Sequence, residues 1–173
     1  MSDKLKTILA FFFFLAALSL PLAGLAYGWW RWDAQTGILL MVGIFAALFI
    51  AGVLSLWSVR DLSWLATSLP FLFGGLYTIL PDFPLQVDDA AATAAGALLS
   101  YALALRKNAK TPKWVLIPLL AAALYALLGG TIPGPVDEIG VDAIALLISW
   151  LGARAGERRA ADESDVFVEI GEL

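Results

Sequence analysis

The chain has 173 residues, of which 61% are hydrophobic and 15% charged, and its formal net charge is -4. This composition excludes an ordinary soluble domain and predicts an all-α integral membrane protein. The sequence contains no cysteine and no histidine. Disulfides, thiol nucleophiles, the usual zinc sites and imidazole bases are therefore excluded, and any chemistry must use carboxylates, hydroxyls or lysine.

The first segment, residues 1–62, is predicted to hold two transmembrane helices. The apolar run Ile8–Trp30 reaches the ~20 residues that one bilayer crossing needs. A secretory signal would have the same outline, with small residues at Gly24 and Ala26 for cleavage, and would remove only this helix. We interpret the run as a retained span. The second span is predicted over Ile38–Trp57, which carries no charge.

Residues 63–110 are predicted to form a helical hairpin. Its first span is Ser63–Leu80, and its second begins at Asp88 and is rich in alanine. Helices associate in lipid by close backbone approach, which small residues permit. The alanine-rich helix is therefore the predicted centre of the bundle.

Residues 111–156 are predicted to form a second hairpin, with spans Trp114–Ile132 and Asp137–Ala153. The last segment, 157–173, is too short for a domain. We predict a charged cytoplasmic tail in which Val166–Ile170 could pair as a strand.

The two hairpins match each other at an offset of 49 residues. Matched positions include a proline, a valine, two consecutive acids and a serine: Pro84, Val87, Asp88, Asp89 and Ser100 in the first copy, and Pro133, Val136, Asp137, Glu138 and Ser149 in the second. The pattern predicts a duplicated hairpin. Both copies would have the same orientation, related by an axis near the membrane normal, as in parallel-repeat transporters.

The basic residues predict the orientation. With a cytoplasmic N-terminus and six transmembrane helices, ten of the 11 lysines and arginines lie inside, and only Arg31 lies outside. We therefore predict a multi-pass protein of the inner (plasma) membrane with both termini cytoplasmic. Expected partners are the lipid bilayer and either further copies of the chain or a larger membrane complex, but no nucleic acid.

The acidic tips of the hairpins then face outward and are predicted to converge. Their residues are Asp82, Asp88 and Asp89 in one copy and Asp137, Glu138 and Asp142 in the other, with Thr93 matching Asp142. Asp142 lies deepest, where an intramembrane carboxylate usually faces an aqueous path or a bound cation. Oxygen ligands from Asp89, Glu138 and Asp142 would suit Mg²⁺, Ca²⁺ or Na⁺.

A simpler interpretation of several of these acids stays open. Asp88 and Asp137 stand just before apolar helices, where aspartate is a common N-cap. Asp82 follows a proline and suits a solvated turn. Capping does not account for Asp142, which lies well inside its helix.

The first tip, ILPDFPLQVDDAAATAAGALL, resembles a widespread, functionally uncharacterised bacterial helical-hairpin family. The signature of that family is approximately D-x-[IL]-P-D-[FL]-I-P-x-x-G-x-[IL]-D-D, and a related hairpin occurs in an animal membrane-bound RING-type ubiquitin ligase. The resemblance covers about thirty residues and is carried by Pro81, Asp82, Phe83, Pro84, Asp88 and Asp89. The second copy keeps Pro133, Asp137 and Glu138. Thr78 replaces the leading aspartate, and the loop is shorter and lacks the glycine. The resemblance implies a hairpin with outward acids and no particular activity.

Three functions follow from these observations. A small cation-binding transporter or channel with an acidic outward vestibule leads, because carboxylate rings draw cations into pores. The alternative is a non-transporting accessory or scaffold subunit of a larger membrane complex. An enzyme ranks third, because the aspartate patterns D-G-x-x-A-R and N-D-x-x-D-x-x-x-D of membrane lipid transferases are both missing and no basic residue near the tips could hold a phosphate.

Overall fold

The computed structural model describes residues 2–79, 87–128 and 136–171, and the regular elements in these ranges are all helical. This confirms the all-α prediction. In chain order the elements are α1 (Asp3–Arg31), α2 (Ala34–Trp57), α3 (Trp64–Gly75), the 3-10 turn η1 (Leu76–Ile79), α4 (Val87–Lys107), the 3-10 turn η2 (Lys113–Val115), α5 (Leu116–Leu128) and α6 (Val136–Gly171).

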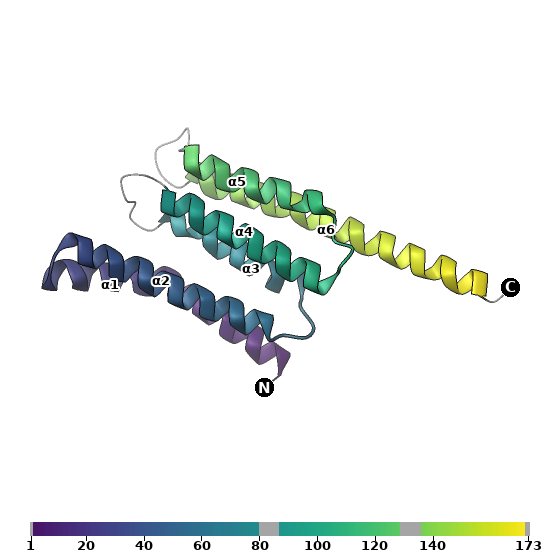
Figure 1. Ribbon diagram of the computed structural model, residues 1–173, viewed down its shortest axis with the longest axis horizontal. Coiled ribbons are helices and arrows are strands. Elements are labelled where there is room, and N and C mark those ends of the chain that lie inside the picture. Colours follow the sequence, from purple (N-terminus) through teal and green to yellow (C-terminus); the bar gives the residue numbers. More distant parts are fainter. Residues whose placement is uncertain (1, 80–86, 129–135, 172–173) are drawn as a thin grey trace.

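The described helices lie side by side along a common direction as three hairpins, α1/α2, α3/α4 and α5/α6 (Figure 1). α3 and α4 occupy the middle, between the N-terminal hairpin and the C-terminal one. The N-terminus lies at the same end of the bundle as the α2–α3 and α4–α5 connections, and α6 continues past that end (Figure 1).

Two of the described helices, α1 and α2, are long and apolar enough to cross a membrane. Only 28% and 33% of their most apolar windows are buried within the protein, so most of this apolar surface faces outward. The segment Lys113–Leu128 is apolar but shorter. α4 and α6 are longer, but small and charged side chains dilute their apolar character. Six spans therefore remain a prediction, and by length and composition two of the described helices are candidate membrane spans.

α1 and α2 pack closely because both carry glycine where they cross. A Cβ atom on Gly28 would collide with the backbone of Gly37, and one on Gly37 would lie 2.7 Å from the carbonyl oxygen of Leu25. Nearer the other end, the buried ring of Phe14 fills the space left by Gly52. Small residues thus bring the two backbones together along their length.

The helix buried on most sides is α3, which corrects the prediction that the alanine-rich α4 is the centre. Nine of the 12 residues of α3 are buried. Leu69, Phe73 and Tyr77 (of η1) pack in a hydrophobic cluster with α1 and α2, while Phe71 belongs to a second cluster with α4, α5 and α6. Small residues in α4 do permit close approach, since a Cβ on Gly96 would collide with the Pro70 carbonyl oxygen. These small residues let α4 pack closely against α3.

α6 is longer than predicted, and the predicted strand at Val166–Ile170 is wrong. The helix runs over 36 residues without a break to Gly171. Residues 154–165 are rich in alanine, glutamate and arginine and contain no proline, and their single glycine, Gly156, weakens a helix without ending it. A strand also needs a neighbouring strand, and the described residues offer none.

Candidate functional site between α3 and α6

Asp142 is the acid that the structure sets most clearly apart. It lies on α6 one turn after Glu138, and its carboxylate points across the helix interface at Gly75 of α3. A Cβ atom on Gly75 would overlap the Oδ2 atom of Asp142. Glycine is therefore the residue that leaves room for this carboxylate. Gly75 also ends the α-helical part of α3, where the chain tightens into the 3-10 turn η1.

The carboxylate lines a cleft of about 170 Å³ between the two helices. The other lining residues are apolar: Phe71, Leu72 and Leu76 from the α3 side, and Ile139, Ala143 and Leu146 from α6. Leu72 and Ala143 are exposed, so the cleft opens on the side of the bundle. A single carboxylate thus stands in a hydrophobic niche.

The other tip acids that the structure describes are at least half-buried. Asp89 is buried on α4, with 4% of its surface exposed. Asp137 accepts a hydrogen bond of 2.8 Å from the Tyr125 hydroxyl of α5, so it joins α5 to α6. Glu138 is half-buried. Asp82 and the side chain of Asp88 lie outside the described residues.

The predicted metal ligands are not assembled. Within the described ranges, no three Asp or Glu side chains come together in a way that could hold a metal ion. Asp142 faces Gly75 on α3, whereas Asp137 is bonded to α5. Ca²⁺ takes six to eight oxygen ligands, and Mg²⁺ demands a near-ideal octahedron. Asp89, Glu138 and Asp142 do not provide such a set in this arrangement.

Two buried threonines accompany these acids. Thr93 is fully buried and Thr78 is 7% exposed, and neither hydroxyl has a hydrogen-bond partner among the residues that the structure describes. An unsatisfied buried hydroxyl costs about 1–3 kcal/mol. Thr93 was predicted as a site residue from its match to Asp142. Thr78 was not, although it stands where the resembled hairpin family carries an aspartate.

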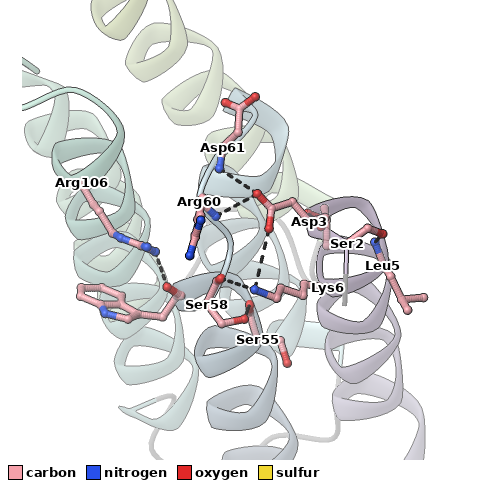
Figure 2. A network of polar contacts seen from close by, with 11 residues as sticks. Ser2, Asp3, Leu5, Lys6, Ser55, Ser58, Arg60, Asp61 and Arg106 are labelled. Carbon is pink, nitrogen blue, oxygen red and sulfur yellow. Dashed lines mark hydrogen bonds and ion pairs between the residues drawn. The ribbon is translucent and has the colours of Figure 1, made fainter.

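A polar network at the opposite end of the bundle was not predicted (Figure 2). One oxygen of Asp3 accepts hydrogen bonds from the backbone N–H groups of Arg60, at 3.1 Å, and Asp61, at 3.2 Å. The N–H of Asp61, more than any other group, lowers the pKa of the Asp3 carboxyl, which precedes the apolar run of α1. This contact ties the start of α1 to the α2–α3 turn.

In the same region, two basic side chains donate hydrogen bonds to the last carbonyl groups of α2. Lys6 donates to the Ser58 carbonyl at 2.6 Å, and the Arg106 guanidinium donates to the Trp57 carbonyl while lying 5.5 Å from the centre of the Trp57 ring. Cations at a helix C-terminus are favoured by the helix dipole. Basic residues that sequence reasoning assigned to membrane topology alone therefore also hold three helices together.

The fold and the site together define a class, an all-helical protein with two candidate membrane helices and a carboxylate in an interhelical cleft. No family model, no curated protein and no solved structure matches this chain. The resemblance to the bacterial hairpin family stays a prediction, and function has to be inferred from the site.

Proposed function

We propose that the chain crosses the inner membrane six times, with both termini cytoplasmic, and that it is a small transporter or channel that binds a cation at Asp142. The side-by-side hairpins support the six crossings, because helices packed alongside α1 and α2 would share their depth in the bilayer (Figure 1). We also propose that the α3/α4 and α5/α6 hairpins are two copies of one duplicated unit.

Tryptophans at both ends of the bundle support this placement. Trp29, Trp30 and Trp32 are exposed where α1 meets α2. At the other end, Trp64 of α3 lies 5.5 Å from Trp150 of α6, measured between ring centres. Amphipathic rings at two levels of a helical bundle are typical of the two membrane interfaces.

The placement of Asp142 is the observation that carries the transport proposal. A carboxylate set among apolar side chains is costly unless a proton or a cation neutralises it. Gly75 leaves space for the charged group where alanine would fill it. A helical scaffold with no functional use for this carboxylate would be more stable with an apolar residue there.

Ion flux into proteoliposomes tests the proposal. We expect the unmodified protein to carry at least one cation from a panel of Na⁺, K⁺, Mg²⁺, Ca²⁺ and a small ammonium ion. Asp142→Asn keeps the shape and removes the charge, so flux should fall at least about tenfold, given that hydrogen bonds to charged groups contribute about 1.5–3 kcal/mol. Asp61→Asn is the matched control, because Asp61 is exposed at the other end. Equal flux in Asp142→Asn would remove this residue from the function.

A second candidate, an accessory or scaffold subunit, is favoured by α6. This helix continues beyond the other helices on the proposed cytoplasmic side (Figure 1). Such an extension could engage a cytoplasmic partner. Purification in mild detergent separates the two functions, since a stoichiometric unrelated subunit would favour the scaffold and a symmetric oligomer of this chain would favour the transporter.

A further inference from the structure

We infer that the cation suited to the α3–α6 cleft is a small organic ammonium ion with an apolar body. This inference rests on the proposed function and names its substrate class. Three observations carry it: the donor set, the lining and the size of the cleft.

The donor set disfavours a metal ion. Of the described residues that line the cleft, Asp142 alone has a side-chain oxygen. A hard metal ion held there would lose most of its hydration shell and gain two oxygens in return. An ammonium group needs far less, because one carboxylate satisfies both its charge and one or two of its N–H donors.

The lining suits an apolar body. Around the carboxylate stand Phe71, Leu72 and Leu76 on the α3 side and Ile139 and Leu146 on α6. Water forms no hydrogen bonds with such walls, whereas a hydrocarbon group is stabilised when it leaves water and contacts them. The Phe71 side chain, which is 1% exposed, gives the niche a fixed wall.

The charges around the cleft fit a monovalent ion. On α6, Glu138 lies one turn from Asp142, and on the α3 side the facing residues Phe71, Gly75 and Leu76 carry no charge. Among the described residues that line the cleft there is no lysine or arginine to compete for the carboxylate. One positive charge is therefore matched by the one half-buried carboxylate of the cleft, with Glu138 one turn away.

The size of the cleft sets the size of the ligand. An apolar cavity of about 150 Å³ holds one benzene molecule, and this cleft measures about 170 Å³. A ring bearing an aminomethyl group, with its nitrogen at Asp142, is of that size. The exposed rim at Leu72 and Ala143 offers a lateral entry.

Benzylammonium is the probe for this inference, and benzyl alcohol is its neutral counterpart. Binding is measured by titration calorimetry on the full chain in nanodiscs of phosphatidylcholine and phosphatidylglycerol, which contain no primary amine. We expect benzylammonium to bind at least about tenfold more tightly than benzyl alcohol, and Asp142→Asn to abolish that preference. Gly140→Ala is the matched control, because Gly140 is on the same helix with open space around it in the described structure.

A second variant tests the cleft without touching the carboxylate. Ala143→Leu enlarges an exposed residue at the rim of the cleft, so the fold should tolerate it. We expect this variant to bind benzylammonium more weakly and methylammonium unchanged. Adding phosphatidylethanolamine to the nanodiscs tests whether a lipid amine competes with benzylammonium. Competition would identify a lipid headgroup as the source of the ligand, and a lack of competition would identify a free amine.

The outcomes separate this inference from the proposed function. Metal-ion flux that depends on Asp142, without benzylammonium binding, would overturn the inference and leave the transporter standing. Equal binding of the amine and the alcohol would also overturn it. If the protein neither transported nor bound any tested cation, both the inference and the proposed function would be overturned.

Discussion

Gly75 and Asp142 face each other across the α3–α6 interface. Gly75 has no side chain, and the carboxylate of Asp142 occupies the space that a side chain there would take. The sequence identified Asp142, because a carboxylate well inside an apolar helix is unusual wherever its neighbours lie. It did not identify Gly75, because a glycine in an apolar helix carries no signal of what faces it. The contact between them joins residues 67 positions apart, and no local pattern encodes which glycine faces which acid.

Replacing Gly75 by alanine tests this pairing. The added methyl group would overlap Oδ2 of Asp142, so the carboxylate must swing away. We expect Gly75→Ala to lower Asp142-dependent cation flux by at least about tenfold, comparable to the loss of one charge-assisted hydrogen bond. Gly140→Ala, which meets open space, should keep flux and gain up to about 1 kcal/mol of helix stability. Equal flux in the two variants would contradict the pairing.

Among the helices, α3 depends most on its neighbours. Pro70 removes one backbone N–H from the helix and its ring disturbs the hydrogen bonding of the preceding turn. The N–H of Phe71 instead donates to the Ser100 hydroxyl oxygen of α4 at 2.9 Å, in a buried position. The Ser100 hydroxyl of α4 thus supplies an acceptor next to the proline inside α3.

Ser100→Ala should therefore destabilise the protein. The Phe71 N–H would lose its acceptor inside the bundle, at a cost of about 1–3 kcal/mol. Thermal unfolding in detergent measures the change. Ser19→Ala is the control, because the Ser19 hydroxyl bonds only within its own exposed helix turn, to the Leu15 carbonyl. Equal melting temperatures for the two variants would show that the Phe71–Ser100 bond contributes nothing.

Helix positions were largely predictable, and helix ends less so. The apolar runs predicted the positions of α1 and α2, because long helices of this composition are recognisable from hydropathy alone. α6 was predicted to stop where its hydrophobicity stops, at Ala153, but helix propensity continues through the charged residues beyond. The network around Asp3 was missed because its acceptors and donors are mostly backbone groups, which every residue possesses.

For the whole molecule, the proposed topology requires the end of the bundle that carries Lys6, Arg60 and Lys110 to be cytoplasmic. The chain has no cysteine, so single cysteines can be introduced without background. Lys110→Cys, in the α4–α5 connection, should be shielded from an impermeant thiol reagent in intact cells, and Gln35→Cys, exposed in the first turn of α2, should react. Reagent access to both positions in intact cells, or to neither, would contradict the proposed topology.

The central claim is that the Asp142 carboxylate stands within the membrane and takes up a cation there. Labelling with a lipid-soluble carbodiimide, followed by mass spectrometry, tests this most directly, because the reagent modifies carboxyl groups reached from the apolar phase. We expect modification at Asp142, none at the exposed Asp61, and protection of Asp142 by benzylammonium but not by benzyl alcohol. An unlabelled Asp142, or one labelled only by a water-soluble carbodiimide, would contradict it.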